Sequence, residues 1–326
     1  MTVPGLPGLP DLPDAPGSAA AAAGRFLPRT HQDPDWTVTD LLRAKGEQTV
    51  SVVLPALNEQ DTVGAVVASV RPHLGELVDE IVVADSGSTD DTVARATEAG
   101  ARVVHRDDVL AELPPWPGKG EVLWRSLAAT SGDIVVFLDS DLVDPDSSFV
   151  PGLLGPLLLD DGVHLVKGFY RRPLRLETEV ANTGGGRVTE LLARPVLAAL
   201  RPALSGVVQP IGGEYAGTRE FLESVPFAAG YGVDIGLLLD AEQRYGVDAL
   251  AQVNLGVRKH RNRSLLQLGV MARQLLGTVL ARCGVEAADS PEFTQFTQVA
   301  GEWLPETSDV FVADRPPMRE VLARLR

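Results

Sequence analysis

The chain has 326 residues, enough to bury a full hydrophobic core in one large domain or two small ones. Its formal net charge of −15 argues against nucleic acid or an anionic membrane as the main partner. No apolar run approaches the roughly 20 residues that span a bilayer, so we expect no integral membrane segment. The chain has a single cysteine, Cys283, so it can form no internal disulfide. We therefore expect the protein to be located in the reducing cytoplasm.

The composition divides the chain into four segments. Residues 1–35 form an N-terminal tail that begins rich in Pro, Gly and Ala. We predict that this tail is disordered, because it cannot bury enough apolar surface to offset its ordering entropy. Residues 36–145 show a regular alternation of strands and helices, residues 146–285 are less regular, and residues 286–326 form a C-terminal extension without a clear pattern.

Apolar runs and turn residues alternate regularly in the first half. We expect a helix from Asp61, its N-cap, with Val63, Val66, Val67 and Val70 on one face. Further helices are expected from about Asp90 and from the Pro/Gly-rich loop at 114–120. The predicted strands are 49–57, 79–85, 102–105 and 134–141. Strands that alternate with helices of this length indicate parallel βαβ units and an α/β fold.

The strand that starts at Ile134 ends in Asp139-Ser140-Asp141. Ligands of open parallel sheets bind beyond the carboxyl ends of the strands. Alternation would place Asp139 and Asp141 on the same side of an extended segment. Carboxylate oxygens suit Mg²⁺, which usually keeps substrate phosphates in its coordination shell. We therefore predict a metal and diphosphate site here; the alternative is that these aspartates only cap the next turn.

Polar groups also follow two other predicted strands. The runs Pro55-Ala56-Leu57-Asn58-Glu59 and Asp85-Ser86-Gly87-Ser88-Thr89 could hold a uracil ring and a ribose, although the second run also suits a turn and a helix cap. Lys119 stands between two glycines where a helix begins, and it could offer a point charge to a phosphate. The alternative for Lys119 is a solvated loop lysine.

The second half carries two further basic or glycine-rich segments. A strand at 165–171 precedes Gly184-Gly185-Gly186-Arg187-Val188-Thr189, which opens a helix to about Leu200 and is suited to bind an anion. The alternative is a flexible linker. A helix at 233–245 and a strand at 249–257 lead to the basic run 258–263, in which His260 is either a metal ligand or a solvated histidine. The helical spacing of Leu268, Met271, Leu275 and Val279 indicates a core or dimer face.

The combined motifs resemble nucleotide-sugar glycosyltransferases of the GT-A fold and, more narrowly, the actinobacterial glucosyl-3-phosphoglycerate synthase family. The resemblance covers about residues 49–283 and rests on Ser51 to Glu59, Asp85 to Thr92, Pro117 to Gly120, Asp139 to Asp141, Tyr170 to Pro173, Gly184 to Thr189 and His260 to Arg263. It implies an α/β fold with a mostly parallel central sheet flanked by helices. Residues 36–145 would then form the nucleotide-sugar-binding half and residues 146–285 the acceptor-binding half.

The resemblance also implies an activity. The family transfers glucose from UDP-glucose to the 2-hydroxyl of 3-phosphoglycerate with retention at the anomeric carbon. It uses Mg²⁺, for which Mn²⁺ or Co²⁺ can substitute, and it forms homodimers. Its product is a precursor of glucosylglycerate and, in mycobacteria, of methylglucose lipopolysaccharides.

The family pattern assigns roles to residues of this sequence. Catalytic roles fall to Lys119, Asp139 and Asp234, and Mg²⁺ would be held by Asp141 and His260 to stabilise charge on the leaving phosphate. Asp234 stands where the family carries a glutamate, and it would orient the reacting groups. The donor would contact Pro55, Ala56, Leu57, Asn58, Glu59, Ser86, Lys119, Asp139 and Ser140; the acceptor would contact Gly186, Arg187, Thr189, Asn262 and Arg263.

Three other functions remain open from the residues. A related transferase could use a GDP-sugar or another phosphorylated acceptor, as in mannosyl transfer to phosphoglycerate or to a polyprenyl phosphate. A non-catalytic nucleotide-sugar sensor would have lost its metal ligands, whereas Asp141 and His260 are present. A sugar-nucleotide pyrophosphorylase would carry a Gly-rich signature after the first strand, where Pro55 to Glu59 stand instead.

Overall fold

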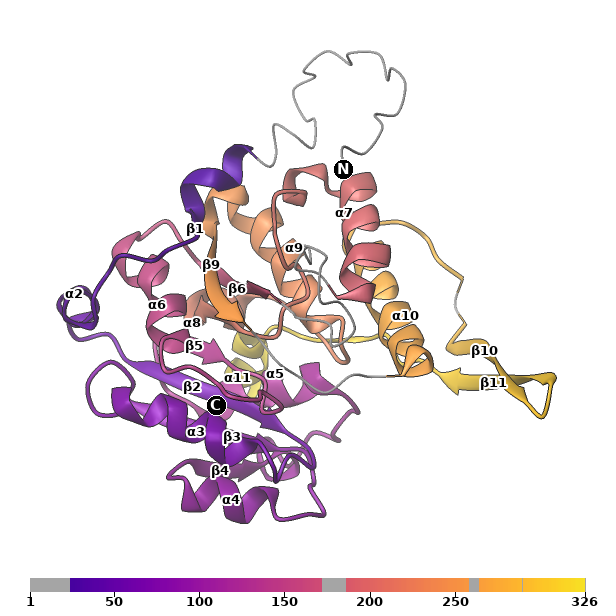
Figure 1. Ribbon diagram of the computed structural model, residues 1–326, viewed down its shortest axis with the longest axis horizontal. Coiled ribbons are helices and arrows are strands. Elements are labelled where there is room, and N and C mark those ends of the chain that lie inside the picture. The colour runs from indigo at the N-terminus through magenta and orange to yellow at the C-terminus, as the bar shows by residue number, and fades with distance from the viewer. Residues whose placement is uncertain (1–23, 172–185, 258–263, 289, 326) are drawn as a thin grey trace, which may run out of the picture.

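The computed structural model describes residues 24–171, 186–257, 264–288 and 290–325 (Figure 1). An eight-stranded sheet lies at its centre, in the order β1-β9-β6-β7-β5-β2-β3-β4. The strands are β1 (Thr30–His31), β2 (Val50–Ala56), β3 (Glu80–Asp85), β4 (Arg102–His105), β5 (Ile134–Phe137), β6 (Leu165–Arg171), β7 (Tyr215–Thr218) and β9 (Leu250–Val257). All of these strands except β7 run in the same direction. The predicted fold, a mostly parallel sheet of an α/β protein, is confirmed.

Alternate residues of the central strands face two separate hydrophobic cores. Val53 of β2 packs into one core, whereas Val52 and Leu54 pack into the other. On β5 the same alternation separates Phe137 from Val136, and all of these side chains are completely buried. A parallel strand covered on both faces needs such a continuous apolar run. The valine-rich sequence of these strands therefore places them in the middle of the sheet.

Helices cover both faces of the sheet. One core receives side chains from α2 (Val38–Lys45), α3 (Val63–Val70), α4 (Thr92–Glu98) and α6 (Phe149–Leu159). The other core receives side chains from α5 (Lys119–Ala129), α7 (Arg194–Leu200), α8 (Arg219–Ser224), α9 (Val233–Tyr245), α10 (Leu265–Arg282) and α11 (Met318–Leu325). On α10, Leu275 and Val279 are buried, and Leu268 and Met271 pack partly buried against them. The core alternative for this apolar stripe is thus confirmed.

Three local expectations were wrong. Asp61 is not the N-cap of α3; that position is Thr62, and it makes no capping hydrogen bond through its side chain. Strand β5 stops at Phe137, and Ser140 and Asp141 lie in a turn rather than in an extended segment. Part of the tail predicted to be disordered is ordered, because β1 pairs with β9 and Phe26 is buried in the core.

The C-terminal extension has a structure that its sequence did not reveal. Strands β10 (Glu292–Val299) and β11 (Glu302–Asp309) form an antiparallel hairpin that extends away from the body of the molecule (Figure 1). The chain then returns, and β12 (Asp314–Arg315) pairs with β8 (Phe227–Ala228). Helix α11 follows and packs against α5 and α8. None of the helices in the described ranges combines the length and apolar character that crossing a bilayer requires.

Candidate functional site

A largely buried lysine joins two carboxylates near the carboxyl ends of the central strands. The Lys119 Nζ lies 2.9 Å from Asp139 Oδ1 and 3.2 Å from Asp234 Oδ1. Lys119 opens α5, Asp139 follows β5, and Asp234 stands in the first turn of α9. The Lys119 side chain is 13% exposed and Asp234 is 3% exposed. The alternative of a solvated loop lysine was therefore wrong, and the three side chains assigned catalytic roles lie together.

The backbone around Lys119 fixes its position. Gly118 has a φ of +111°, a conformation that favours glycine. The Gly120 and Glu121 amides donate to the carbonyls of Gly230 and Ala229, at 3.3 and 3.1 Å. A Cβ on Gly120 would lie only 1.8 Å from the Ala228 carbonyl oxygen, so only glycine permits this approach. The amino end of α5 is thus bonded to the segment that leads into α9, which brings Lys119 to Asp234.

Burial and charge oppose one another in this cluster. Burial by itself would lower the pKa of Lys119, but the carboxylates of Asp139 and Asp234 raise it well above its ordinary value. Burial raises the pKa of Asp234, and the positive charges of Lys119 and Lys167 oppose only part of that rise. Lys119 therefore stays protonated in the buried site, where it offsets the two carboxylates.

Three buried polar residues beside this cluster were missed by the sequence analysis. Lys167, Glu214 and Tyr215 are 2%, 0% and 0% exposed. The Lys167 Nζ donates to the Gly212 carbonyl at 2.7 Å and lies 4.3 Å from the centre of the Tyr215 ring. Burial lowers the pKa of Lys167 to about 8. A lysine inside an apolar strand was the signal, because charged side chains are rarely buried without a partner.

The Asp139-Ser140-Asp141 segment is fastened to the end of β2. The Ser140 hydroxyl donates to the Pro55 carbonyl at 2.6 Å. A Cβ on Gly213 would lie between 2.2 and 2.6 Å from the Asp139 carboxylate atoms, so this carboxylate is packed tightly against the Gly213 backbone. With Asp139 bound to Lys119, Asp141 is the carboxylate of this segment that suits a divalent cation.

Asp141 fits the chemistry of magnesium. Among the described residues, no group of three or more His, Cys, Asp or Glu side chains is placed to hold a metal ion. His260, the second predicted ligand, lies outside these residues. Magnesium is commonly bound by one or two carboxylates, with water and substrate phosphates completing its coordination. One carboxylate at the carboxyl edge of the sheet satisfies the protein's part of that arrangement.

The loops after β2 and β3 are hydrogen-bonded to each other. Asn58 has a φ of +57°; its amide donates to the Ser88 hydroxyl at 2.9 Å, and its Oδ1 accepts from the Thr89 amide at 2.8 Å. The Asp85 carboxylate accepts from the amides of Gly87 and Ser88 at 2.9 and 3.1 Å, which confirms the predicted turn.

The other predicted donor residues lie along the same edge. Ala56 is buried, Leu57 is 53% exposed, the Glu59 amide donates to the Thr92 hydroxyl, and the Ser86 hydroxyl accepts from Arg106.

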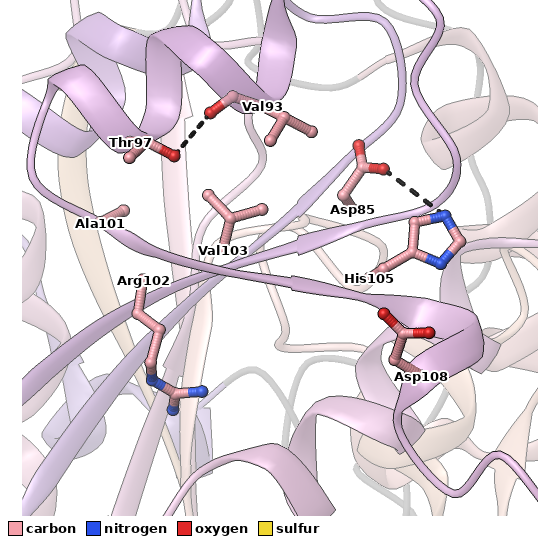
Figure 2. Close-up of a pocket in the computed structure, with 8 residues that line it drawn as sticks. All are labelled: Asp85, Val93, Thr97, Ala101, Arg102, Val103, His105 and Asp108. Carbon is pink, nitrogen blue, oxygen red and sulfur yellow. Dashed lines mark hydrogen bonds and ion pairs between the residues drawn. The ribbon is translucent and has the colours of Figure 1, made fainter.

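A pocket lies between α4 and β4, beside this edge. Figure 2 shows Val93, Thr97, Ala101 and Val103 around it, with Arg102, Asp85, His105 and Asp108 as its charged or ionisable lining. His105 and Asp85 point toward one another, with the Nε2 and Oδ2 atoms 4.0 Å apart. The pocket shares Asp85 with the β3 loop, but its lining does not include Lys119, Asp139 or Asp234.

The glycine-rich segment of the second half is described from Gly186 onward. The Gly186 carbonyl accepts from the Glu190 amide at 3.0 Å, so a helical segment begins here as predicted. Its turns over Thr189–Ala193 are a π-helix, a feature the sequence did not predict. Arg187 is exposed and Thr189 is 4% exposed. Residues 172–185 and the predicted acceptor ligands Asn262 and Arg263 lie outside the described ranges.

A second buried charge network holds the loop that precedes Lys119. Glu121 is completely buried between two arginines: Arg125 Nε and Arg315 Nε each lie 2.6 Å from one of its oxygens. The two guanidinium groups also donate to backbone carbonyls of Val109, Leu110, Leu113 and Pro114. Arg315 lies over the ring of Trp116, 3.8 Å from its centre. The C-terminal segment is thus joined to the loop and helix that carry Lys119.

Comparison with known proteins identifies similar sequences and structures. The family model described as glycosyl transferase family 2 matches residues 51–174. A protein of Mycolicibacterium smegmatis named glucosyl-3-phosphoglycerate synthase is 62% identical over 291 residues, which are 89% of this chain and 96% of that protein.

Two crystal structures of glucosyl-3-phosphoglycerate synthase from Mycobacterium tuberculosis are also similar. One contains Mn²⁺, UDP-glucose and phosphoglyceric acid; its TM-score is 0.83 at 55% identity, with 90% of this chain and 99% of that chain covered. The other contains Mg²⁺ and UDP; its TM-score is 0.83 at 56% identity, with 90% and 98% covered.

Replacing Arg315 tests the buried network. The substitution Arg315→Met leaves Glu121 buried with Arg125 as its remaining ionic partner, and we expect the free energy of unfolding to fall by about 3–5 kcal/mol. Urea unfolding measures this loss. In the control Arg324→Met, the arginine is 75% exposed and pairs with Glu320 at 3.6 Å, so we expect about 0–1 kcal/mol. Equal losses in the two variants would contradict the importance of the network.

Proposed function

The chain belongs to the glucosyl-3-phosphoglycerate synthase family, and we propose that it transfers glucose from UDP-glucose to the 2-hydroxyl of 3-phosphoglycerate at the site of Lys119, Asp139 and Asp234. The observation that carries this assignment of the site is the buried lysine between two carboxylates, next to the Asp141 turn. Charged groups cluster at the carboxyl edge of a parallel sheet, where ligands of such folds bind.

The donor would lie along the loops after β2, β3 and β5. The hydrogen bonds between Asn58, Ser88 and Thr89 hold two of these loops in one arrangement, and the Ser140 hydroxyl joins the third loop to Pro55. Binding surfaces that are already rigid lose less entropy when the ligand binds. The nucleoside would contact Pro55 to Glu59 and Ser86, and Asp139 and Ser140 would lie beside the ribose or sugar.

Asp141, together with His260, would hold a divalent metal against the diphosphate. When bound, this metal supplies positive charge that stabilises the leaving UDP. The solved structures of the family from Mycobacterium tuberculosis contain Mn²⁺ or Mg²⁺ with the nucleotide. Asp139 is engaged by Lys119, which leaves the ligand role in this segment to Asp141.

The reaction breaks the bond from the anomeric carbon of glucose to the diphosphate oxygen and forms a bond from that carbon to the acceptor oxygen. Retention places the attacking hydroxyl on the face that UDP leaves, so its proton can pass to the departing phosphate. Asp234 would orient the reacting groups rather than form a covalent bond. The shorter aspartate side chain still reaches Lys119, with both carboxylate oxygens within 3.3 Å of the Nζ.

The acceptor would bind through its phosphate. Gly186, Arg187 and Thr189, which open a helical segment, would take the phosphate, with Asn262 and Arg263 as further partners. The exposed guanidinium of Arg187 suits this role because arginine pairs with phosphate through two parallel hydrogen bonds. It would also offset locally the repulsion between an acidic protein and an anionic substrate.

Release of UDP tests the reaction directly. We expect the purified protein to release UDP from UDP-glucose with Mg²⁺ only when 3-phosphoglycerate is present, because the acceptor hydroxyl is needed for transfer. GDP-glucose and GDP-mannose are the control donors, and we expect no release of GDP from them. Release of GDP from a GDP-sugar, with none of UDP from UDP-glucose, would show that the proposed donor is wrong. Metal-dependent binding of UDP-glucose without release of UDP would show that the proposed acceptor is wrong.

Arg187→Ala tests the acceptor phosphate site. We expect the KM for 3-phosphoglycerate to rise by roughly 10- to 100-fold, while the KM for UDP-glucose stays within about twofold, because a charge-assisted hydrogen bond is worth about 1.5–3 kcal/mol. Steady-state kinetics with each substrate varied in turn measures the two constants. Arg95→Ala, an exposed arginine on α4, is the control and should change neither. An equal rise of both KM values would show that Arg187 does not bind the acceptor specifically.

We propose that a second copy of this chain covers the β10–β11 hairpin to form a homodimer. Phe296 and Trp303 are 61% and 66% exposed on the hairpin. We expect light scattering to give twice the mass of one chain for the wild type and a monomer for the double variant F296S/W303S. Leu159→Ser, at a position 51% exposed on α6, is the control and should remain dimeric. A monomeric wild type, or a double variant that stays dimeric, would refute this interface.

A further inference from the structure

The buried charges of the site do not balance with Lys119 alone. Lys119 contacts Asp139 and Asp234, and a third carboxylate, Glu214, is completely buried nearby. Lys167 is the second cation, and it interacts electrostatically with all three carboxylates. Burying a lysine is costly unless opposite charges and hydrogen bonds compensate. The position of Lys167 in an apolar strand is therefore explained by the site rather than by the packing of the sheet.

Lys167 also contacts the backbone that packs against Asp139. Its Nζ donates to the carbonyl of Gly212, and the next residue, Gly213, lies so close to the Asp139 carboxylate that a Cβ at this position would displace that carboxylate. The Gly168 amide donates to the Glu214 carbonyl at 2.8 Å, so β6 holds this turn from two neighbouring residues. Displacement of the turn would change the position of Asp139 relative to Lys119.

We infer that Lys167 is a positioning residue for glucosyl transfer, because it holds the Gly212–Gly213 turn against Asp139 and supplies the second positive charge that faces Asp234. This role rests on the proposed function of the Lys119 site. It acts through the turn and through the carboxylates, and it requires no contact between Lys167 and the substrates.

The substitution Lys167→Met removes the charge and the hydrogen bond but keeps much of the apolar volume. We expect kcat to fall roughly tenfold or more, since small displacements of reacting groups are that costly, while the KM for UDP-glucose stays within about twofold. Lys167→Arg, which keeps the charge, should recover part of kcat.

Lys45 offers a matched control. It is 7% exposed, its Nζ donates to the Glu76 carbonyl at 3.0 Å, and it lies 2.9 Å from an Asp79 oxygen. These partners precede β3, at the opposite edge of the sheet from the site. Both Lys45→Met and Lys167→Met should lower Tm, because each removes a buried ammonium from its partners, but Lys45→Met should leave kcat unchanged. If Lys167→Met also lowers only Tm, Lys167 is structural and the inference is overturned.

The dependence of kcat/KM on pH distinguishes a positioning role of Lys167 from a role in packing alone. The groups that face Lys167 are Asp139, Asp234, Glu214, Lys119 and Tyr215. Since burial lowers the pKa of Lys167 to about 8, kcat/KM of the wild type should fall as pH rises through about 8, where the ammonium loses its proton. In Lys167→Arg the fall should move to higher pH, because arginine stays protonated. An unchanged profile would overturn the inference.

A crystal structure of Lys167→Met gives a readout that does not depend on turnover. A displaced Gly212–Gly213 turn with a shifted Asp139 would support the role of Lys167, and an unchanged turn would overturn it. If the wild type released no UDP with 3-phosphoglycerate, the proposed function would fail, but the crystal structure would still decide whether Lys167 positions this turn.

Discussion

The burial of Lys119 between Asp139 and Asp234 is the interaction on which the arrangement of the site depends. A buried ammonium needs partners at short distance, and each partner here comes from a different part of the chain. The end of β5, the start of α5 and the first turn of α9 must therefore meet at one point. Removing the charge of Lys119 would leave the buried Asp234 carboxylate without its closest positive charge.

Close backbone contacts make that meeting possible. The amides that begin α5 donate to the carbonyls of Ala229 and Gly230, and Gly120 has no Cβ to hinder their approach. On the far side of α5, Glu121 binds Arg315, which returns from the end of the chain after the β10–β11 hairpin. The C-terminal extension thus helps to hold the loop and the helix that carry Lys119.

The distribution of charge reconciles an acidic chain with anionic substrates. The chain has a net charge of −15, whereas two of its four lysines, Lys119 and Lys167, lie among carboxylates at the carboxyl edge of the sheet. Such buried lysines hold carboxylates in defined positions without creating a strongly basic surface. The charge that meets the acceptor would come instead from the exposed Arg187.

Sequence patterns predicted most of the parallel sheet, because apolar runs bounded by turn residues reflect local geometry. Strand β4 at Arg102–His105 and helix α9 at Val233–Tyr245 were predicted at their observed bounds. One wrong expectation concerned Asp139 and Asp141: β5 ends at Phe137, and Ser140 and Asp141 lie in a turn, so strand alternation does not set the direction of the two aspartates. The pairing of β1 with β9 joins residues more than 200 positions apart, which no local pattern reveals.

By itself, the sequence determined the α/β class, the polar ends of the strands and the residues that resemble the family's motifs. These features depend on residue type and on spacing along the chain. Only the tertiary structure decided that Lys119 is largely enclosed between Asp139 and Asp234, that Lys167 and Glu214 lie beside it, and that Arg315 supports the loop before α5. The physical reason is that the cost of burying a charge is set by neighbours in space, and these neighbours are distant in sequence.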